Sequence, residues 1–202
     1  MPVTLLSDKV PKSIKELEKI LLANRGLSDG VSFFHPVHPA DLTEFETGLT
    51  HEMLEAVAER LLVAKKSHET VLIFGDYDAD GVCATAILWE ALFSLGIRAQ
   101  PFIPDRFNHG YGLTVKAIEA VITPTKPDLI ITVDNGIVAY EALEEARRLG
   151  ISTIVTDHHQ PDTKPLPADL VLHSTKLSGS GVAWMLAHHL APTVALQSLE
   201  LA

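Results

Sequence analysis

The chain has 202 residues, of which 47% are apolar and 21% charged, a composition that supports one α/β domain with a buried core and excludes disorder. Its single cysteine, Cys83, excludes an internal disulfide and a thiolate metal cage, and the absence of a signal-peptide layout or a membrane-length apolar run favours a cytoplasmic protein. The net charge of −10 counts against a chain that binds nucleic acid through a basic surface of its own.

The first 49 residues are predicted to form an extension to the main domain. Ser13 and Glu16 have the spacing of a capping box and predict a helix over residues 13–26. Residues 28–49 contain scattered Gly and Pro without a clear period, which indicates a loop-rich connection. Thr50 can cap the next helix, predicted over residues 51–66, so the main domain is expected to span residues 50–202.

From residue 70 onward, apolar β-branched runs alternate with helical patterns. Strands are predicted at 70–76, 97–104, 127–134 and 151–157, and helices at 81–96, 113–122 and 139–150. Residues 105–112 read as a loop. This alternation predicts an α/β fold, a parallel β-sheet with helices on both faces.

Acidic residues and histidines follow three of these strands where each strand ends. Because the ligand crevice of an open α/β sheet lies outside the carboxyl ends of its strands, these side chains are expected to converge at one edge. A single Asp at such a place is usually a helix cap or a turn residue, but three consecutive strands repeat the pattern. The residues are Asp76, Asp78, Asp80, Asp134, Asp157, His158 and His159.

The first of these segments, "GDYDADG" at residues 75–81, could be taken for an EF-hand calcium loop. That loop requires a bidentate Glu at its twelfth position, and counting from Asp76 that position holds Ile87. An EF-hand also requires a preceding helix, whereas "TVLIF" reads as a strand. A carboxylate cluster with histidine and without cysteine instead suits Mn²⁺ or Mg²⁺, and two such ions can polarise a phosphoryl group and activate water.

The segments "GDYDADG", "TVDNGI" and "VTDHHQP" resemble the first three motifs of the DHH phosphoesterase superfamily. "PDRFNHGYGL" and the glycine-rich "LSGSGVAWMLA" resemble stretches of one branch, the RecJ single-strand exonucleases. The likeness extends from about residue 20 to residue 190. It implies a hydrolase that uses two Mn²⁺ or Mg²⁺ ions to cleave single-stranded DNA from the 5′ end.

The resemblance also implies roles for individual residues. Metal ligands would be Asp76, Asp78, Asp80, Asp134 and His158, with Asp134 bridging the two ions. His159 would lie beside the scissile phosphate, and Asp157 would orient the histidines. Substrate contacts and the turn after the bridging carboxylate would involve Arg106, Asn135 and Gly136.

The sequence departs from the family pattern at two places. Phe74 stands where some branches have a metal-binding His, so one ligand is absent. The fourth family motif and the second substrate-binding domain are not found, and Glu200 is the only acidic residue after residue 170. Domain 50–202 is therefore expected to be an incomplete DHH domain with weak activity or none, either a fragment or a shortened relative.

Two alternatives remain open at this point. The same chemistry could act on short oligonucleotides, cyclic dinucleotides or pyrophosphate, although the loop at residues 106–113 favours DNA. The chain could instead be a non-catalytic DHH scaffold in replication or repair. The expected partners are single-stranded DNA and repair or replication proteins, with no membrane.

Overall fold

The computed structural model describes residues 9–27, 30–110, 112–192 and 197–198, and it divides into two compact units, Met1–Leu42 and Thr43–Ala202. The first unit contains helix α1 (Ile14–Asn24), the single turn α2 (Val31–Phe34) and the 3₁₀ turn η1 (Pro39–Asp41). Ser13 caps α1 as predicted, but the Glu16 carboxylate accepts from the amide of Lys12, at 2.8 Å. The short turns α2 and η1 lie where only loop was predicted.

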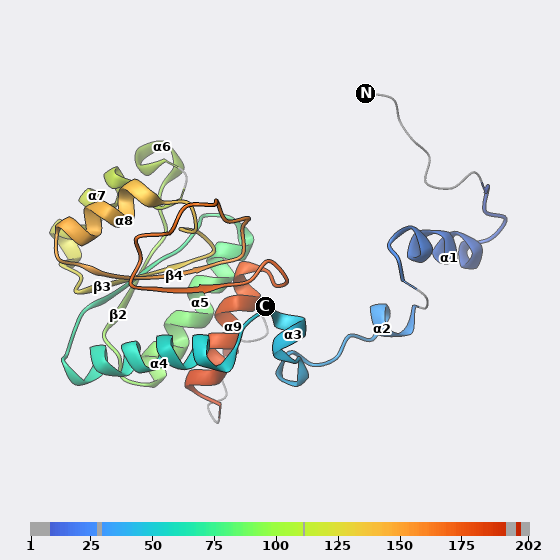
Figure 1. Ribbon diagram of the computed structural model, residues 1–202, viewed down its shortest axis with the longest axis horizontal. Coiled ribbons are helices and arrows are strands. Elements are labelled where there is room, and N and C mark those ends of the chain that lie inside the picture. The colour runs from blue at the N-terminus through green and yellow to red at the C-terminus, as the bar shows by residue number, and fades with distance from the viewer. Residues whose placement is uncertain (1–8, 28–29, 111, 193–196, 199–202) are drawn as a thin grey trace. The chain divides into compact units, whose positions relative to one another are not determined.

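The second unit is built on five parallel strands in the order β2-β1-β3-β4-β5, which confirms the predicted α/β fold (Figure 1). The strands are β1 (Val71–Phe74), β2 (Ala99–Phe102), β3 (Leu129–Val133), β4 (Ser152–Asp157) and β5 (Leu170–His173). Strands β1 and β3 are buried along their whole length, which explains why they read as unbroken apolar runs and not as alternating ones. The strand β5 at one edge was not predicted.

Helices cover both faces of this sheet, as predicted (Figure 1). One buried cluster joins the sheet to α4 (His51–Lys66), α5 (Ala79–Ser94) and α9 (Gly179–Leu190). The other joins the opposite face to α7 (Val115–Thr125) and α8 (Tyr140–Arg148). The short helices α3 (Glu44–Thr47) and α6 (Arg106–His109) lie in segments that were predicted as loop. Among the helices of the described ranges, none is long and apolar enough to cross a membrane.

The strand order places the candidate residues together. From β1 the chain passes through α5 to β2 on one side, whereas β3 pairs with the other side of β1. The carboxyl ends of β1 and β3 therefore form the switch point at which α/β sheets bind ligands. Strand β4 pairs with β3 in a register that sets Val133 beside Thr156, so Asp134 and Asp157 leave the sheet at the same edge.

The first turn of α5 packs directly on the loop that follows β1. A Cβ built at Gly81 would lie 2.6–2.7 Å from the Cβ, Cα and N atoms of Asp76, so only glycine fits there. Gly81→Ala should therefore lower the free energy of unfolding by about 1–3 kcal/mol through overpacking, although alanine is the better helix former. Thermal denaturation measures this change.

The matched control for that substitution is Gly181→Ala in the first turn of α9. Its Cβ would lie 3.3 Å from the Cβ of Leu177 and from the Oγ of Ser178, contacts that a shift of a few tenths of an ångström relieves. We expect the control to change the melting temperature much less. A Gly81→Ala protein at least as stable as the wild type would mean that α5 does not pack on Asp76 in this way.

Candidate metal centre

The loop after β1 holds its three carboxylates with backbone amides. Asp76 is 1% exposed and accepts from the amide of Tyr77 at 2.6 Å. Asp78 is the N-cap of α5 and accepts from Gly81 at 2.9 Å. Each of these side chains therefore has a structural contact as well as a place at the sheet edge.

Asp80 connects this loop to α9. Its two carboxylate oxygens accept from the amides of Gly179 and Ser180, each at 2.7 Å. Burial raises the pKa of Asp80, but hydrogen bonds from the side chain and amide of Ser180 and from the amide of Gly179, with the nearby His158, outweigh it, so the pKa lies below its ordinary value. Asp80 is thus held as an anion in the middle of the candidate centre.

Asp134 follows β3 and is the most constrained carboxylate of the centre. It is 2% exposed, and its backbone is left-handed, with φ at 62°, a conformation that Asp tolerates better than most residues. Its Oδ1 accepts no hydrogen bond in the described part of the chain. Burial, followed by the negative charges of Asp80 and Asp78, raises the pKa of Asp134 to about 7. A bound cation would relieve this repulsion.

Asp157, at the end of β4, organises the histidine pair. Its Oδ1 accepts from the amides of His158 and His159, at 2.7 and 3.1 Å, and lies 2.8 Å from Nδ1 of His159. Its Oδ2 accepts from the amide of Ile137 at 2.9 Å. Burial lowers the pKa of His159, but the contact with Asp157 outweighs it and the net pKa is raised. The Nδ1 proton of His159 therefore faces Asp157, which leaves Nε2 for the centre.

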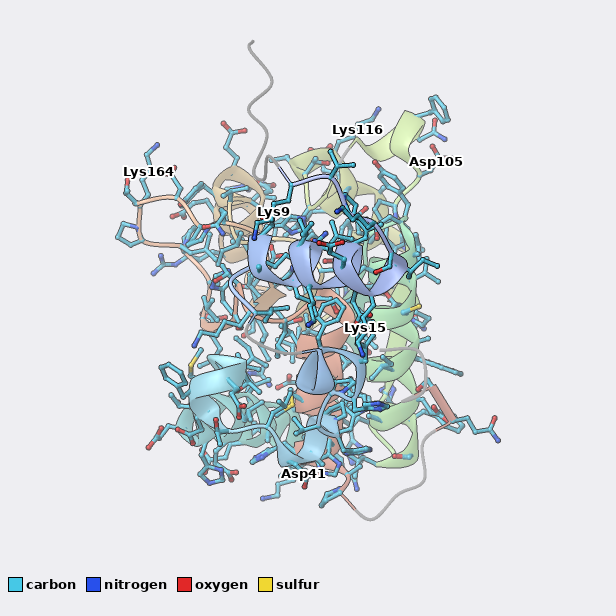
Figure 2. All side chains as sticks on the ribbon, turned by 90° about the vertical axis from the view of Figure 1, so that its right-hand side faces the viewer. Lys9, Lys15, Asp41, Asp105, Lys116 and Lys164 are labelled. Atoms are coloured by element: carbon cyan, nitrogen blue, oxygen red, sulfur yellow. The ribbon has the colours of Figure 1, made fainter. Side chains whose placement is uncertain are left out.

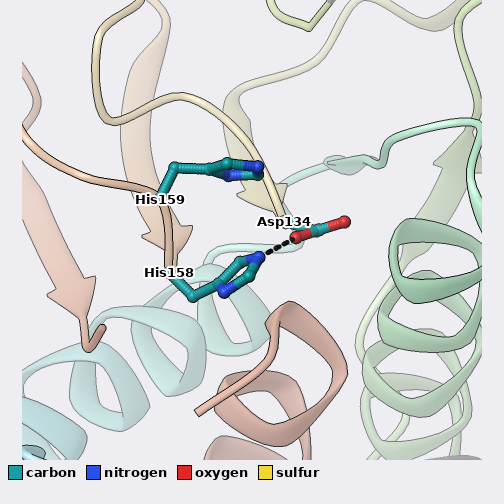
Figure 3. Close-up of side chains that lie close together, drawn as sticks. All are labelled: Asp134, His158 and His159. Atoms are coloured by element: carbon teal, nitrogen blue, oxygen red, sulfur yellow. Dashed lines mark ion pairs between the residues drawn. The ribbon is translucent and has the colours of Figure 1, made fainter. Parts of the chain in front are cut away.

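The ends of β3 and β4 come together at His158. Its Nε2 lies 3.2 Å from Oδ1 of Asp134 (Figure 3). The same nitrogen lies 3.7 Å from Oδ2 of Asp80. The ring of His159 lies 4.5 Å from that of His158, centroid to centroid. Within the described residues, Asp134, His158 and His159 can offer ligand atoms that all lie within 4.8 Å of one another. A buried carboxylate oxygen beside imidazole nitrogens is a donor set that suits a divalent cation.

The remaining predicted residues lie around this group in different ways. Asn135 is buried and donates through Nδ2 to the carbonyls of Phe74 and Val133, at 3.2 and 2.9 Å. Gly136 has φ at 111°, and a Cβ there would lie 2.8 Å from Oγ1 of Thr132, so the turn requires glycine. The side chain of Arg106 lies outside the part of the chain that the structure describes. Phe74 is fully buried in β1.

Two residues of the centre, Gly179 and Ser180, were not predicted from the sequence. The amides of Gly179 and Ser180 hold Asp80, and a Cβ at Gly179 would lie 2.2 Å from Oδ1 of Asp134. The glycine-rich segment was the available signal, because a glycine at a helix start indicates a close approach of the backbone to something else. What approaches is Asp134, which the sequence alone does not show.

The chain is similar in sequence to curated RecJ exonucleases. The chain is 35% identical to the single-stranded-DNA-specific exonuclease RecJ of Bacillus subtilis over 198 residues, which cover 94% of this chain and 25% of the relative. It is 39% identical to RecJ of Thermus thermophilus over 140 residues, 66% of this chain and 21% of the relative. The chain thus spans about a quarter of the length of these relatives.

Solved structures show the same fold. A crystal structure of exonuclease RecJ bound to manganese matches with a TM-score of 0.66 and 34% identity, over 80% of this chain and 41% of that one. RecJ of Thermus thermophilus in complex with Mn²⁺ matches with a TM-score of 0.63 and 31% identity, over 87% of this chain and 25% of that one. Residues 70–201, more than half of the chain, match the DHH family, N-terminal domain. The chain therefore belongs to the DHH family.

Proposed function

We propose that this centre binds Mn²⁺ or Mg²⁺, as two ions, and that the chain contributes it to a phosphodiesterase that cleaves single-stranded DNA from the 5′ end. The observation that carries the proposal is the buried carboxylate of Asp134, whose Oδ1 accepts no hydrogen bond in the described residues and whose pKa is raised by burial and by neighbouring carboxylates. Buried charges of one sign are costly unless a cation compensates them.

The proposed ligands are the carboxylates of Asp76, Asp78, Asp80 and Asp134 with the imidazole of His158. A divalent cation held there would withdraw charge from a phosphoryl oxygen and activate water for attack. Metal-bound forms of two RecJ proteins, at 34% and 31% identity to this chain, support the choice of cation. The two relatives named for single-stranded-DNA-specific exonuclease activity support the choice of substrate.

The remaining residues would position the substrate and its protons. His159 is oriented by Asp157 through Nδ1, so its Nε2 can donate a hydrogen bond or a proton to a phosphate oxygen. Arg106 would contact a phosphate of the strand, and Asn135 and Gly136 would shape the wall beside His159. This positioning would lower the activation barrier of the reaction. In well-oriented sites the reduction reaches about 7–11 kcal/mol.

The domain organisation forms part of the same proposal. Residues 1–49 would be an extension, and residues 50–202 would belong to the DHH domain. For such an exonuclease we also propose a cytoplasmic location and partners among DNA-repair or replication proteins. With a net charge of −10, we expect slow cleavage that requires low salt, since strand binding depends on cationic contacts.

The first prediction concerns the charge of Asp134 in the metal-free protein. With a folded-state pKa of about 7 against about 4 when unfolded, the folded state retains a proton that the unfolded state loses. Stability should therefore fall as pH rises from about 4 to 7. Asp134→Asn removes this penalty and should raise the free energy of unfolding at pH 8 by on the order of 2–4 kcal/mol, with little change at pH 4.

Thermal denaturation in a chelating buffer at the two pH values measures this difference. Added Mn²⁺ should raise the melting temperature of the wild type at pH 8 and leave Asp134→Asn unchanged, because binding to the folded state stabilises it. The control is Asp162→Asn, which removes an exposed carboxylate of the same unit. If Asp134→Asn and wild type melt together at pH 8 and respond equally to Mn²⁺, the ion binds elsewhere.

The second prediction concerns cleavage. Incubated with Mn²⁺ at low salt, the chain should slowly release mononucleotides from the 5′ end of a labelled single-stranded oligonucleotide. His159→Ala should reduce the rate by about 100-fold or more, as expected on losing a proton donor. The matched control His189→Ala removes a histidine of α9 that pairs with Glu55, and should retain the wild-type rate.

The same assay separates the alternatives. Pyrophosphate, a cyclic dinucleotide and a duplex of the same sequence are tested in parallel under identical conditions. Faster hydrolysis of a small phosphoester would replace DNA as the substrate and keep the chemistry. Equal rates in His159→Ala and His189→Ala would remove His159 from the reaction. No Mn²⁺-dependent hydrolysis of any of them would leave the scaffold as the better account.

A further inference from the structure

A groove leads away from His159 along the edge of the sheet. A cavity of about 240 Å³ is lined by His159 and Asp157 at one end, and by residues 112–113 and 135–139. A larger cavity of about 690 Å³ lies next to it, and both share Leu113, Val138 and Ala139 in their walls. The two cavities are therefore neighbours, and we call them together the α7–α8 groove.

Asn135, in the wall of the cavity nearest His159, has a buried hydrogen-bond acceptor without a partner among the described residues. Asn135 lines this cavity, is 4% exposed, and has its amide orientation fixed because Nδ2 donates to two carbonyl groups. Its Oδ1 has no hydrogen-bond partner among the described residues. A buried acceptor without a partner is costly, so a donor from a ligand would satisfy it. Sugar hydroxyl and base amino groups are such donors.

The far part of the groove supplies cations and an aromatic ring. Lys116 and Lys164 both line the larger cavity, together with Tyr140. Figure 2 shows the two lysines at the same end of the unit and apart from one another, Lys164 on the left and Lys116 to the right of the centre. The ammonium of Lys164 lies 5.8 Å from the centroid of the Tyr140 ring. Two separated cations in one groove match successive phosphates better than a single phosphate.

The groove is not uniformly basic. Glu141 lines the same cavity, and Asp162 is close enough to raise the pKa of Tyr140, after the larger effect of burial. The apolar surface of Leu113 and Val138 forms the stretch between the centre and the lysines. The balance of charge predicts modest affinity, and a groove that combines cations with the aromatic ring of Tyr140 has the elements that bind single strands.

We propose that the α7–α8 groove is a binding track for single-stranded nucleic acid, in which the strand leaves the metal centre past Asn135 and Val138 and places successive phosphates near Lys116 and Lys164. The inference rests on the proposed function for its choice of ligand. It names residues beyond the metal centre that would hold the strand, although the overall negative charge of the chain repels nucleic acid.

The test is binding of a short fluorescent oligothymidylate in a chelating buffer, in which no cleavage occurs. Lys116→Gln and Lys164→Gln should each weaken binding about three- to tenfold at low salt. Each should also lower the slope of log K against log salt by about 0.7, the value for one phosphate contact on a single strand. The control Lys66→Gln removes an exposed lysine from the end of α4 and should leave both values unchanged.

A second pair of variants tests the apolar wall with matched charge. Val138→Glu introduces a carboxylate at a residue that is 57% exposed and lines both cavities, and it should abolish measurable binding. Val63→Glu makes the same change at a residue of α4 that is 48% exposed, and it should bind like the wild type. Equal loss in both would mean that only net charge matters, which overturns the track.

The outcomes separate this proposal from the proposed function. Lysine-dependent binding in a chain that never cleaves would retain the track and remove the nuclease. Mn²⁺-dependent cleavage with binding that is absent, or unchanged by Lys116→Gln and Lys164→Gln, would remove the track and retain the nuclease. If thymidine monophosphate competes as tightly as the oligonucleotide, the groove holds one nucleotide and is not a track.

Discussion

Asp134 carries a carboxylate that is almost completely buried and whose charged neighbours include the carboxylates of Asp80 and Asp78. Nothing in the packing around it requires an acid: Gly179 leaves room for the side chain but donates its amide to Asp80. A buried acid in such surroundings is stable at neutral pH only if it keeps its proton or gains a cation. The sheet edge is arranged around that one carboxylate. Asp134 follows β3, the start of α9 packs against its side chain, and His158 at the end of β4 lies beside it.

The contacts of Asp80 tie the centre to the fold. This side chain begins in the first turn of α5 and holds the first amides of α9, a helix about 100 positions later in the chain. Helices α5 and α9 also share the larger buried cluster under the sheet. A charge at Asp80 therefore stabilises the start of α9 as an N-terminal anion does. Asp80, which would hold an ion, also joins two helices, so the fold itself positions its carboxylate.

Much of this arrangement could be predicted from the sequence, for a physical reason. Strands β1, β3 and β4 are apolar runs that end in Asp, and parallel strands deliver their ends to one edge, so the convergence of Asp134 with His158 follows from topology alone. The hydrogen bonds of Asp80 to Gly179 and Ser180 could not be predicted, because they join segments whose pairing depends on how α9 packs. The edge strand β5 was missed since its four residues, "LVLH", are too short to show a period. The short helices α3 and α6 were missed because single turns are set by caps such as Thr43 and Asp105, and not by a repeating apolar face.

The same electrostatics determine how an acidic chain could hold a polyanion. The sheet edge holds the carboxylates of Asp76, Asp78, Asp80 and Asp134 close together, and in the absence of cations their repulsion of a phosphate within a Debye length of roughly 10 Å is poorly screened. Two divalent cations would offset the four negative charges of these carboxylates, while the distant acidic residues of the surface would be screened by salt. Attraction would then be confined to the centre and to the groove that ends at Lys116 and Lys164. A strand would be held where it can react, and would find little to bind on the rest of the surface, so the negative net charge would favour binding at the centre over binding elsewhere.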